Sequence, residues 1–240
     1  MQVVETVDVG GGRNLPLTII TPDGDPPPAG WPGVIVLYEA FGMQPDIVRA
    51  AERFTSRGWA AVIPDFLAVG NSIKCLVGAL KEIGTSKPGP FVQLAVASGK
   101  HLGARADVDE GRIAVIGFCL GGGLALLAGT VEGSGIKAVA ANYADIPKKD
   151  TLRTSAPVVG AYGQKDLWLR TKGKKLHERL EACGVANDIK TYDNAGHSFM
   201  TDGKHPVAKY TMIALSLGEV PDAANDAWDR VFIWLDTHVA

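Results

Sequence analysis

The sequence predicts an α/β fold with a mainly parallel central sheet, helices on both faces of the sheet, and an antiparallel hairpin at the N-terminus. Short apolar runs that suit buried strands alternate along the chain with segments of helical periodicity. Glycine and proline mark the boundaries between them. With 240 residues the chain can bury a sizeable core, and we expect a single domain over residues 1–240.

The elements are expected in a regular order along the chain. Residues 3–9 and 15–20 flank a glycine-rich turn and predict the hairpin, and the proline-rich residues 23–33 predict a loop. Further strands are expected at residues 34–37, 60–63, 113–116, 136–140, 157–161 and 188–192. Helices are expected around residues 47–54, within 91–102, directly after Cys119, and at 173–183 and 223–239. Residues 66–89 and 200–221 show no assignable pattern, and we expect surface loops or lid-like pieces there.

Composition and charge argue against several classes of partner. The formal net charge of −2 gives no electrostatic basis for binding nucleic acid or an anionic membrane. Three cysteines far apart do not make a disulfide framework. No secretory signal is apparent, and no apolar stretch approaches the ~20 residues of a membrane-spanning helix. We therefore expect a cytoplasmic protein, a monomer or small homo-oligomer, that needs no metal and no cofactor.

The most informative segment is Gly117-Phe118-Cys119-Leu120-Gly121, which separates an expected strand from an expected helix. This is the layout of a nucleophile elbow with sulfur in place of the usual serine oxygen. Glycines two positions away on either side are needed because a Cβ there would clash with neighbouring backbone. The helix N-terminus favours a thiolate, and the amide of Leu120 is expected to donate one hydrogen bond of an oxyanion hole.

Taken alone, this segment also fits a buried structural cysteine beside a tight contact between a helix and a strand. A phosphate-binding loop fits less well, because no Gly-Lys-Ser/Thr follows and Gly121-Gly122-Gly123 does not complete a Gly-x-Gly-x-x-Gly motif. Cys75 and Cys183 have no flanking glycines, and we expect them to be packing residues.

Two later loops carry the acid and the base that a cysteine nucleophile needs. Asp166 ends a glycine turn after the strand at 157–161, and His197 follows Gly196 after the strand at 188–192. Each residue alone also fits a turn or capping role. The order Cys119, Asp166, His197, with each group after a strand, favours a catalytic triad at the carboxyl edge of the sheet.

The chain resembles the dienelactone hydrolase family, also called carboxymethylenebutenolidases, which has the α/β-hydrolase fold. The resemblance runs from Val34 to the C-terminal helix and is carried by four segments, at residues 117–122, 163–166, 196–199 and 37–42. It implies that Cys119 is the nucleophile, that His197 is the base, and that Asp166 orients His197.

Glu39 lies in the last of these segments, Leu-Tyr-Glu-Ala-Phe-Gly, after the strand at 34–37. It also fits a solvated loop acid. The resemblance implies that Glu39 keeps the resting thiol neutral and takes its proton when substrate arrives, as expected of a carboxylate beside a thiol. The amide of Ala40 is then the second oxyanion-hole donor. The implied reaction is hydrolysis of an ester or lactone through an acyl-thioester, with water activated by His197.

The substrate does not carry over from the resemblance. Family members that act on dienelactone have arginines for the substrate carboxylate, one of them four residues after the histidine, where this chain has Thr201. The variable region after Phe66 has no arginine before Arg105, and Lys74 or Lys81 would lack the bidentate fork of arginine. We therefore expect an uncharged or larger ester as the substrate.

A largely apolar substrate pocket is expected from side chains near the same edge, although each of them also fits the core: Phe41, Tyr143, Trp168, Ser198, Phe199 and Thr201. Two alternatives stay open. One is a non-catalytic binding protein on the same fold, which the intact set of Cys119, Asp166 and His197 argues against. The other is a peptidase or acyltransferase, which amide substrates and alcohol acceptors would distinguish.

Overall fold

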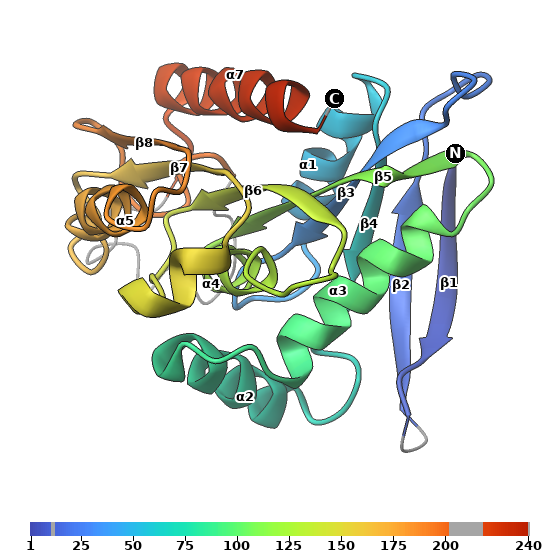
Figure 1. Ribbon diagram of the computed structural model, residues 1–240, viewed down its shortest axis with the longest axis horizontal. Helices are drawn as coiled ribbons and strands as arrows, with labels where there is room; N and C mark the ends of the chain where they lie inside the picture. Colours follow the sequence, from blue (N-terminus) through green and yellow to red (C-terminus); the bar gives the residue numbers. More distant parts are fainter. Residues whose placement is uncertain (11–12, 202–217, 240) are drawn as a thin grey trace.

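The computed structural model describes residues 1–10, 13–201 and 218–239. It contains an eight-stranded sheet of order β1-β2-β4-β3-β5-β6-β7-β8 (Figure 1). The strands are β1 (Gln2–Asp8), β2 (Asn14–Ile20), β3 (Trp31–Leu37), β4 (Ala60–Pro64), β5 (Val108–Phe118), β6 (Ile136–Asn142), β7 (Val158–Gly163) and β8 (Asn187–Tyr192). The helices are α1 (Pro45–Thr55), α2 (Ser72–Thr85), α3 (Pro90–Gly103), α4 (Leu120–Ala128), α5 (Lys172–Glu181) and α7 (Pro221–His238), with a 3₁₀ helix at Lys149–Thr154.

The sheet is antiparallel at one side and parallel over the rest. Strand β1 pairs with β2 from Gln2↔Ile20 to Asp8↔Asn14, and β2 runs antiparallel to β4. All other neighbouring strands are parallel. Helices α1 and α7 cover one face, and α2 to α5 lie on the other (Figure 1). The predicted α/β fold with its N-terminal hairpin is confirmed.

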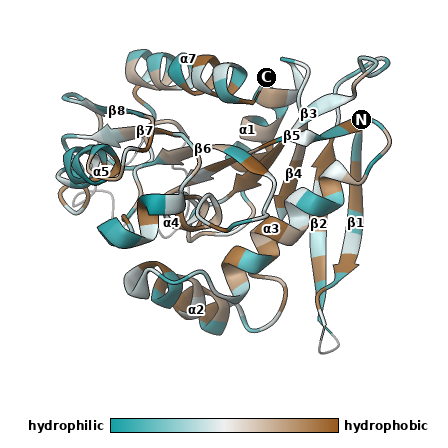
Figure 2. Ribbon diagram, viewed as in Figure 1, coloured by the Kyte–Doolittle hydropathy of each residue, from teal (hydrophilic) through white to brown (hydrophobic). Residues whose placement is uncertain are grey.

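Buried apolar strands form the centre of the sheet. The side chains from Val34 to Leu37 in β3 and from Ala60 to Ile63 in β4 have 0% exposure. Strands covered on both faces need such continuous apolar runs, and Figure 2 shows the hydrophobic colour concentrated on these strands. Within the described ranges, no helix combines the length and the hydropathy needed to cross a bilayer.

The loop expected at residues 23–33 ends earlier than the sequence suggested. Strand β3 already begins at Trp31, whose buried side chain joins the core and whose amide donates to the Asp107 carbonyl at 2.9 Å. Pro32 follows at the start of the strand, where a missing amide hydrogen is tolerated. The proline therefore did not exclude strand structure here.

The segment 66–89, expected to be irregular, contains helix α2. Its large apolar residues recur at helical spacing but point outward: Ile73, Val77 and Leu80 are 74%, 60% and 53% exposed. The face that packs inward carries Ala79, Glu82 and Ile83 instead. An apolar stripe on the solvent side and a charged residue on the buried side are the reverse of the usual amphipathic arrangement.

Buried Glu82 joins α2 to α3. Its carboxylate accepts hydrogen bonds from the amides of Gly89 at 3.1 Å, Phe91 at 2.9 Å and Val92 at 3.1 Å. These are free amides at the start of α3, whose N-cap Gly89 has no side chain to satisfy them. Both helices pack against α4, so this carboxylate supports the helix that follows the elbow.

The other segment without an assignment, 200–221, lies mostly outside the described residues, since 202–217 are not described. Helix α7 begins at its end and agrees with the helix expected at 223–239. Its apolar face packs on β6 and β7 through residues that include Ala227, Trp228 and Val231.

Candidate active site

Cys119 occupies the turn between β5 and α4, as the elbow motif predicts. Its φ of 53° and ψ of −113° lie in a region that a residue with a Cβ adopts only under strain. The amide of Cys119 donates to the carbonyl of Asn142 at 3.0 Å, and the Asn142 side chain donates to the Gly117 carbonyl at 3.4 Å. Asn142 thus supports the turn from the neighbouring strand, a role that the sequence did not reveal.

The two elbow glycines are required by close backbone contacts. A Cβ on Gly117 would lie 2.1 Å from the carbonyl oxygen of Gly121, and a Cβ on Gly121 would lie 2.2 Å from the carbonyl oxygen of Leu37. Both distances are shorter than non-bonded contacts between a carbon and an oxygen atom in proteins. The first contact lies within the turn itself, and the second packs the turn against the end of β3.

Asp166 and His197 meet at the edge where β7 and β8 end. The Nδ1 atom of His197 and Oδ2 of Asp166 are 2.6 Å apart, and Asp166 is fully buried. The other oxygen of Asp166 accepts the amides of Trp168 and Leu169, each at 3.0 Å. The carboxylate is therefore fixed in position and holds the imidazole in one orientation.

The electrostatics of His197 connect it to Cys119 as well. Burial acts most strongly on His197 and lowers its pKa, but the charge of Cys119, the hydrogen bonds to Asp166 and Cys119, and the charge of Asp166 together outweigh it. The result is a pKa raised to about 10. The structure thus brings together the three residues that the sequence singled out.

Glu39 lies at the same edge, only 6% exposed. Its carboxylate accepts hydrogen bonds from Ser198 Oγ at 3.1 Å and from Thr201 Oγ1 at 3.0 Å. Burial raises the pKa of Glu39, while the positive charge of His197 and the two hydroxyl donors act in the opposite direction. The expected contact between Glu39 and the thiol is not among these bonds and stays a prediction.

The oxyanion-hole candidates belong to the same edge. Leu120 is the first residue of α4, and a helix offers no carbonyl partner for the amide of its first residue. Ala40 directly follows Glu39 and, with Phe41, lines a cavity of about 440 Å³. The other walls of this cavity are mostly apolar: Gly42, Leu67, Ala68, Ile73 and Leu76, with Asp65 and Ser72 as polar members.

The remaining residues expected in the substrate pocket lie in different surroundings. Tyr143 and Phe199 have 0% exposure; Tyr143 packs edge-on against the His197 ring at 5.1 Å and also contacts Phe199. The Trp168 side chain is 67% exposed, and the residue reaches the site through its backbone amide. Ser198 and Thr201 are buried and hydrogen-bond to Glu39.

Backbone strain is concentrated here. Four described residues other than glycine have positive φ, and three of them are Cys119 at 53°, Tyr143 at 37° and Ser198 at 56°. Each such conformation costs on the order of 1–3 kcal/mol and persists only where the surroundings impose it. Their gathering around one sheet edge is typical of a functional site.

The fold is that of an α/β hydrolase. A sequence profile of the dienelactone hydrolase family matches residues 18–239. The carboxymethylenebutenolidase of Rhodococcus opacus is 25% identical over 224 residues, which cover 86% of this chain and 81% of that protein. The chain therefore belongs to the dienelactone hydrolase family, and with it to the carboxylic ester hydrolases.

Solved structures agree on the fold. A dienelactone hydrolase-like promiscuous phosphotriesterase from metagenomic libraries aligns with a TM-score of 0.78 at 20% identity, covering 100% of this chain and 99% of that one. The dienelactone hydrolase of Anabaena variabilis aligns with a TM-score of 0.70 at 17% identity, with the same coverage.

The elbow contact predicts a sharp difference between two glycine substitutions. We expect Gly121→Ala to abolish esterase activity and lower the yield of folded protein, because the new Cβ overlaps the Leu37 carbonyl. Gly84→Ala in α2 is the control, since a Cβ there meets nothing within 4 Å. It should leave activity unchanged and stabilise the fold by about 0.5–1 kcal/mol in urea unfolding. A fully active Gly121→Ala enzyme would contradict the elbow geometry.

The raised pKa of His197 predicts how its ring titrates. In the wild type, ¹⁵N NMR of the imidazole should show the cation persisting until pH rises to about 10. Cys119→Ser removes the negative charge that favours the cation, so the pKa of His197 should fall. Cys183→Ser should leave the His197 titration unchanged. An identical midpoint in wild type and Cys119→Ser would show that Cys119 does not influence the ring.

Proposed function

We propose that this protein hydrolyses a neutral ester or lactone through the thiolate of Cys119 and an acyl-thioester intermediate. The observation that carries the proposal is the position of the His197 ring between two partners, Asp166 at 2.6 Å and Cys119, with a pKa raised to about 10. A cationic imidazole beside a thiolate is the arrangement that activates cysteine nucleophiles.

In the first half-reaction, the sulfur of Cys119 attacks the carbonyl carbon and forms a C–S bond, and the π electrons move to the oxygen. The amides of Leu120 and Ala40 donate to this oxyanion. When the tetrahedral intermediate collapses, the C–O bond breaks and the leaving alkoxide takes a proton from the imidazolium of His197. The products of this step are an alcohol and the acyl-thioester.

In the second half-reaction, neutral His197 takes a proton from water as the water oxygen adds to the thioester carbonyl. The same two amides bind the second oxyanion. Its collapse breaks the C–S bond, releases the carboxylic acid and restores the ion pair between Cys119 and His197. Asp166 keeps the ring in the reactive orientation throughout. Where Cys119 is a neutral thiol before the reaction, the Glu39 carboxylate takes its proton and generates the thiolate.

The site favours an uncharged substrate. Position 201 holds a threonine that is 4% exposed and whose hydroxyl is bonded to Glu39, so it offers no charge to an anion. The cavity beside Ala40 has mostly apolar walls and suits an alkyl or aryl group of the substrate. Both features support a neutral ester rather than a carboxylate-bearing lactone.

Two other functions are compatible with the fold. A binding protein without catalysis would not need the buried Asp166–His197 pair or a strained Cys119. A peptidase or acyltransferase would use the same residues, and it differs only in the leaving group or acceptor. Turnover of amide substrates, or transfer to added alcohols faster than hydrolysis, would favour that alternative.

The nucleophile assignment predicts the effect of removing sulfur. Cys119→Ala should lower the turnover of p-nitrophenyl acetate by roughly 10⁴-fold or more and leave the circular dichroism spectrum unchanged, because the covalent route is lost. Cys75→Ala and Cys183→Ala are matched controls that should keep wild-type turnover. If Cys119→Ala retains more than a tenth of the wild-type rate, the cysteine mechanism is wrong.

The lack of an arginine at position 201 predicts the charge preference. The wild type should hydrolyse a neutral lactone at least as well, in kcat/KM, as its carboxylate-bearing analogue. A bidentate arginine would contribute roughly 1.5–3 kcal/mol, or about a ten- to hundredfold preference for the anion. A preference of more than tenfold for the anionic lactone would overturn this assignment. Lys74→Ala and Lys81→Ala would then locate the basic group.

A further inference from the structure

Thr201 occupies a special place among the residues around Glu39. Its hydroxyl oxygen lies 3.0 Å from Glu39 Oε1, 3.2 Å from the Ser198 carbonyl oxygen and 3.4 Å from the Tyr143 hydroxyl. All of these residues are buried. The hydroxyl therefore has two acceptors for its single hydrogen, and its oxygen can itself accept one.

Ser198 provides an internal comparison. Its hydroxyl donates to Glu39 Oε2 at 3.1 Å, and the described part of the chain shows no second partner for it. Burial raises the pKa of Tyr143 well above its ordinary value, so the phenol keeps its proton and remains a donor. The hydroxyl groups of Tyr143 and Thr201 thus form a chain that ends on the Glu39 carboxylate.

We propose that Thr201 is a positioning residue whose hydroxyl reverses its hydrogen bond when Glu39 gains or loses a proton. With Glu39 ionised, Thr201 donates to Oε1 and accepts from Tyr143. With Glu39 protonated on Oε1, the acid donates to Thr201 Oγ1, and the Thr201 hydrogen turns to the Ser198 carbonyl. Only the added proton differs between the two states, and Thr201 stays neutral in both.

Such a hydroxyl matters because a buried carboxyl group needs a partner in each protonation state. A residue that could only donate would favour the anion alone. Thr201 satisfies both forms, so Glu39 can titrate without leaving a buried polar atom unpaired. The inference rests on the proposed role of Glu39 as a group that takes up and releases a proton.

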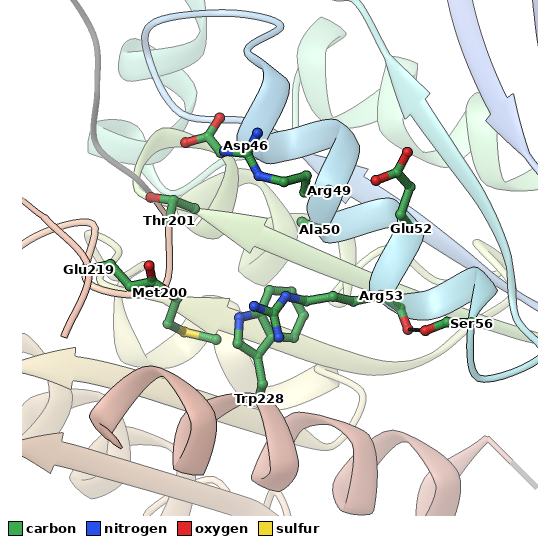
Figure 3. Close-up of a pocket in the computed structure, with 10 residues that line it drawn as sticks. All are labelled: Asp46, Arg49, Ala50, Glu52, Arg53, Ser56, Met200, Thr201, Glu219 and Trp228. Carbon is green, nitrogen blue, oxygen red and sulfur yellow. Dashed lines mark hydrogen bonds between the residues drawn. The ribbon is translucent and has the colours of Figure 1, made fainter. Parts of the chain in front are cut away.

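Titratable groups around Glu39 also bear on its protonation. His197 faces it from the loop after β8, Asp46 from the start of α1, and Tyr143 from the end of β6. Thr201 also borders a cavity of about 330 Å³ between α1 and α7, into which Asp46 and Arg49 extend (Figure 3). These groups remain in place when Thr201 is changed to a residue of the same shape, so the effect of the hydroxyl can be isolated.

Infrared difference spectroscopy between low and high pH tests the proposal without turnover. The carbonyl band of protonated Glu39 is identified by its loss in Glu39→Gln. In Thr201→Val this band should move to higher wavenumber, because the acid loses its acceptor. The titration midpoint of the band should move to higher pH, because the bond that favours the anion is the stronger of the two. Thr201→Ser should restore both properties.

Two further variants complete the experiment. Ser198→Ala should raise the midpoint as well, because it removes the other hydroxyl that donates to the anion, but the protonated acid should keep its acceptor. Thr130→Val should change nothing, since the hydroxyl of this buried threonine donates only to the Leu127 carbonyl in the described chain. Thr201→Ala serves if the valine variant does not fold. An unchanged band in Thr201→Val or Thr201→Ala, failure of Thr201→Ser to restore it, or no Glu39 band at all would overturn the proposal.

These spectra are independent of the esterase test. If Cys119→Ala keeps its activity while the Glu39 band behaves as expected, the cysteine mechanism fails and the Thr201 assignment stands. If the Glu39 band does not respond to Thr201→Val but Cys119→Ala is inactive, the Thr201 assignment fails and the cysteine mechanism stands. If the wild type is an active esterase, Thr201→Val should also have a kcat/KM roughly tenfold lower than that of the wild type near neutral pH. Thr201→Ser should recover most of the lost kcat/KM.

Discussion

The contact between the elbow and the end of β3 determines the layout of the whole site. Strands β3 and β5 are parallel neighbours, with Leu37 opposite Gly117, so the two strands deliver their following loops to the same place. The backbone of Gly121 then rests on the Leu37 carbonyl with no room for a side chain. As a result Cys119 emerges beside the segment that carries Glu39. The acid and the histidine come from β7 and β8, further along the same edge.

Two buried carboxylates at this edge are held by different kinds of partner. Asp166 accepts two backbone amides, pairs with the His197 ring and is fully buried. Glu39 accepts only side-chain hydroxyls, and burial raises its pKa. Backbone amides can only donate to a carboxylate, whereas a hydroxyl can donate to it or accept from it. In the proposed mechanism, Asp166 orients the base and Glu39 exchanges a proton with the thiol.

The sequence was sufficient where a single local pattern fixes the structure. Alternating apolar runs located the strands, and the glycine-framed Cys119 located the elbow. Helix α2 was not predicted, although Ile73, Val77 and Leu80 have helical spacing; the sequence also could not show that these residues face solvent and that Glu82 lies on the buried face. It also could not show that Thr201 bonds to Glu39, because that pairing joins residues 162 positions apart through tertiary packing. The sequence placed Thr201 in the expected substrate pocket but did not indicate Glu39 as its partner.

The elbow has a consequence for how the chemistry of this chain can change over generations. Its glycines, the Asn142 carbonyl and the end of β3 hold the backbone of residue 119, and none of these contacts involves the side chain. The architecture therefore places no demand on whether sulfur or oxygen stands at that position. One nucleotide change can exchange cysteine for serine, a soft sulfur for a harder oxygen, while the scaffold, Asp166 and His197 remain as they are. Selection can thus act on the side-chain atom at position 119 separately from the fold that presents it.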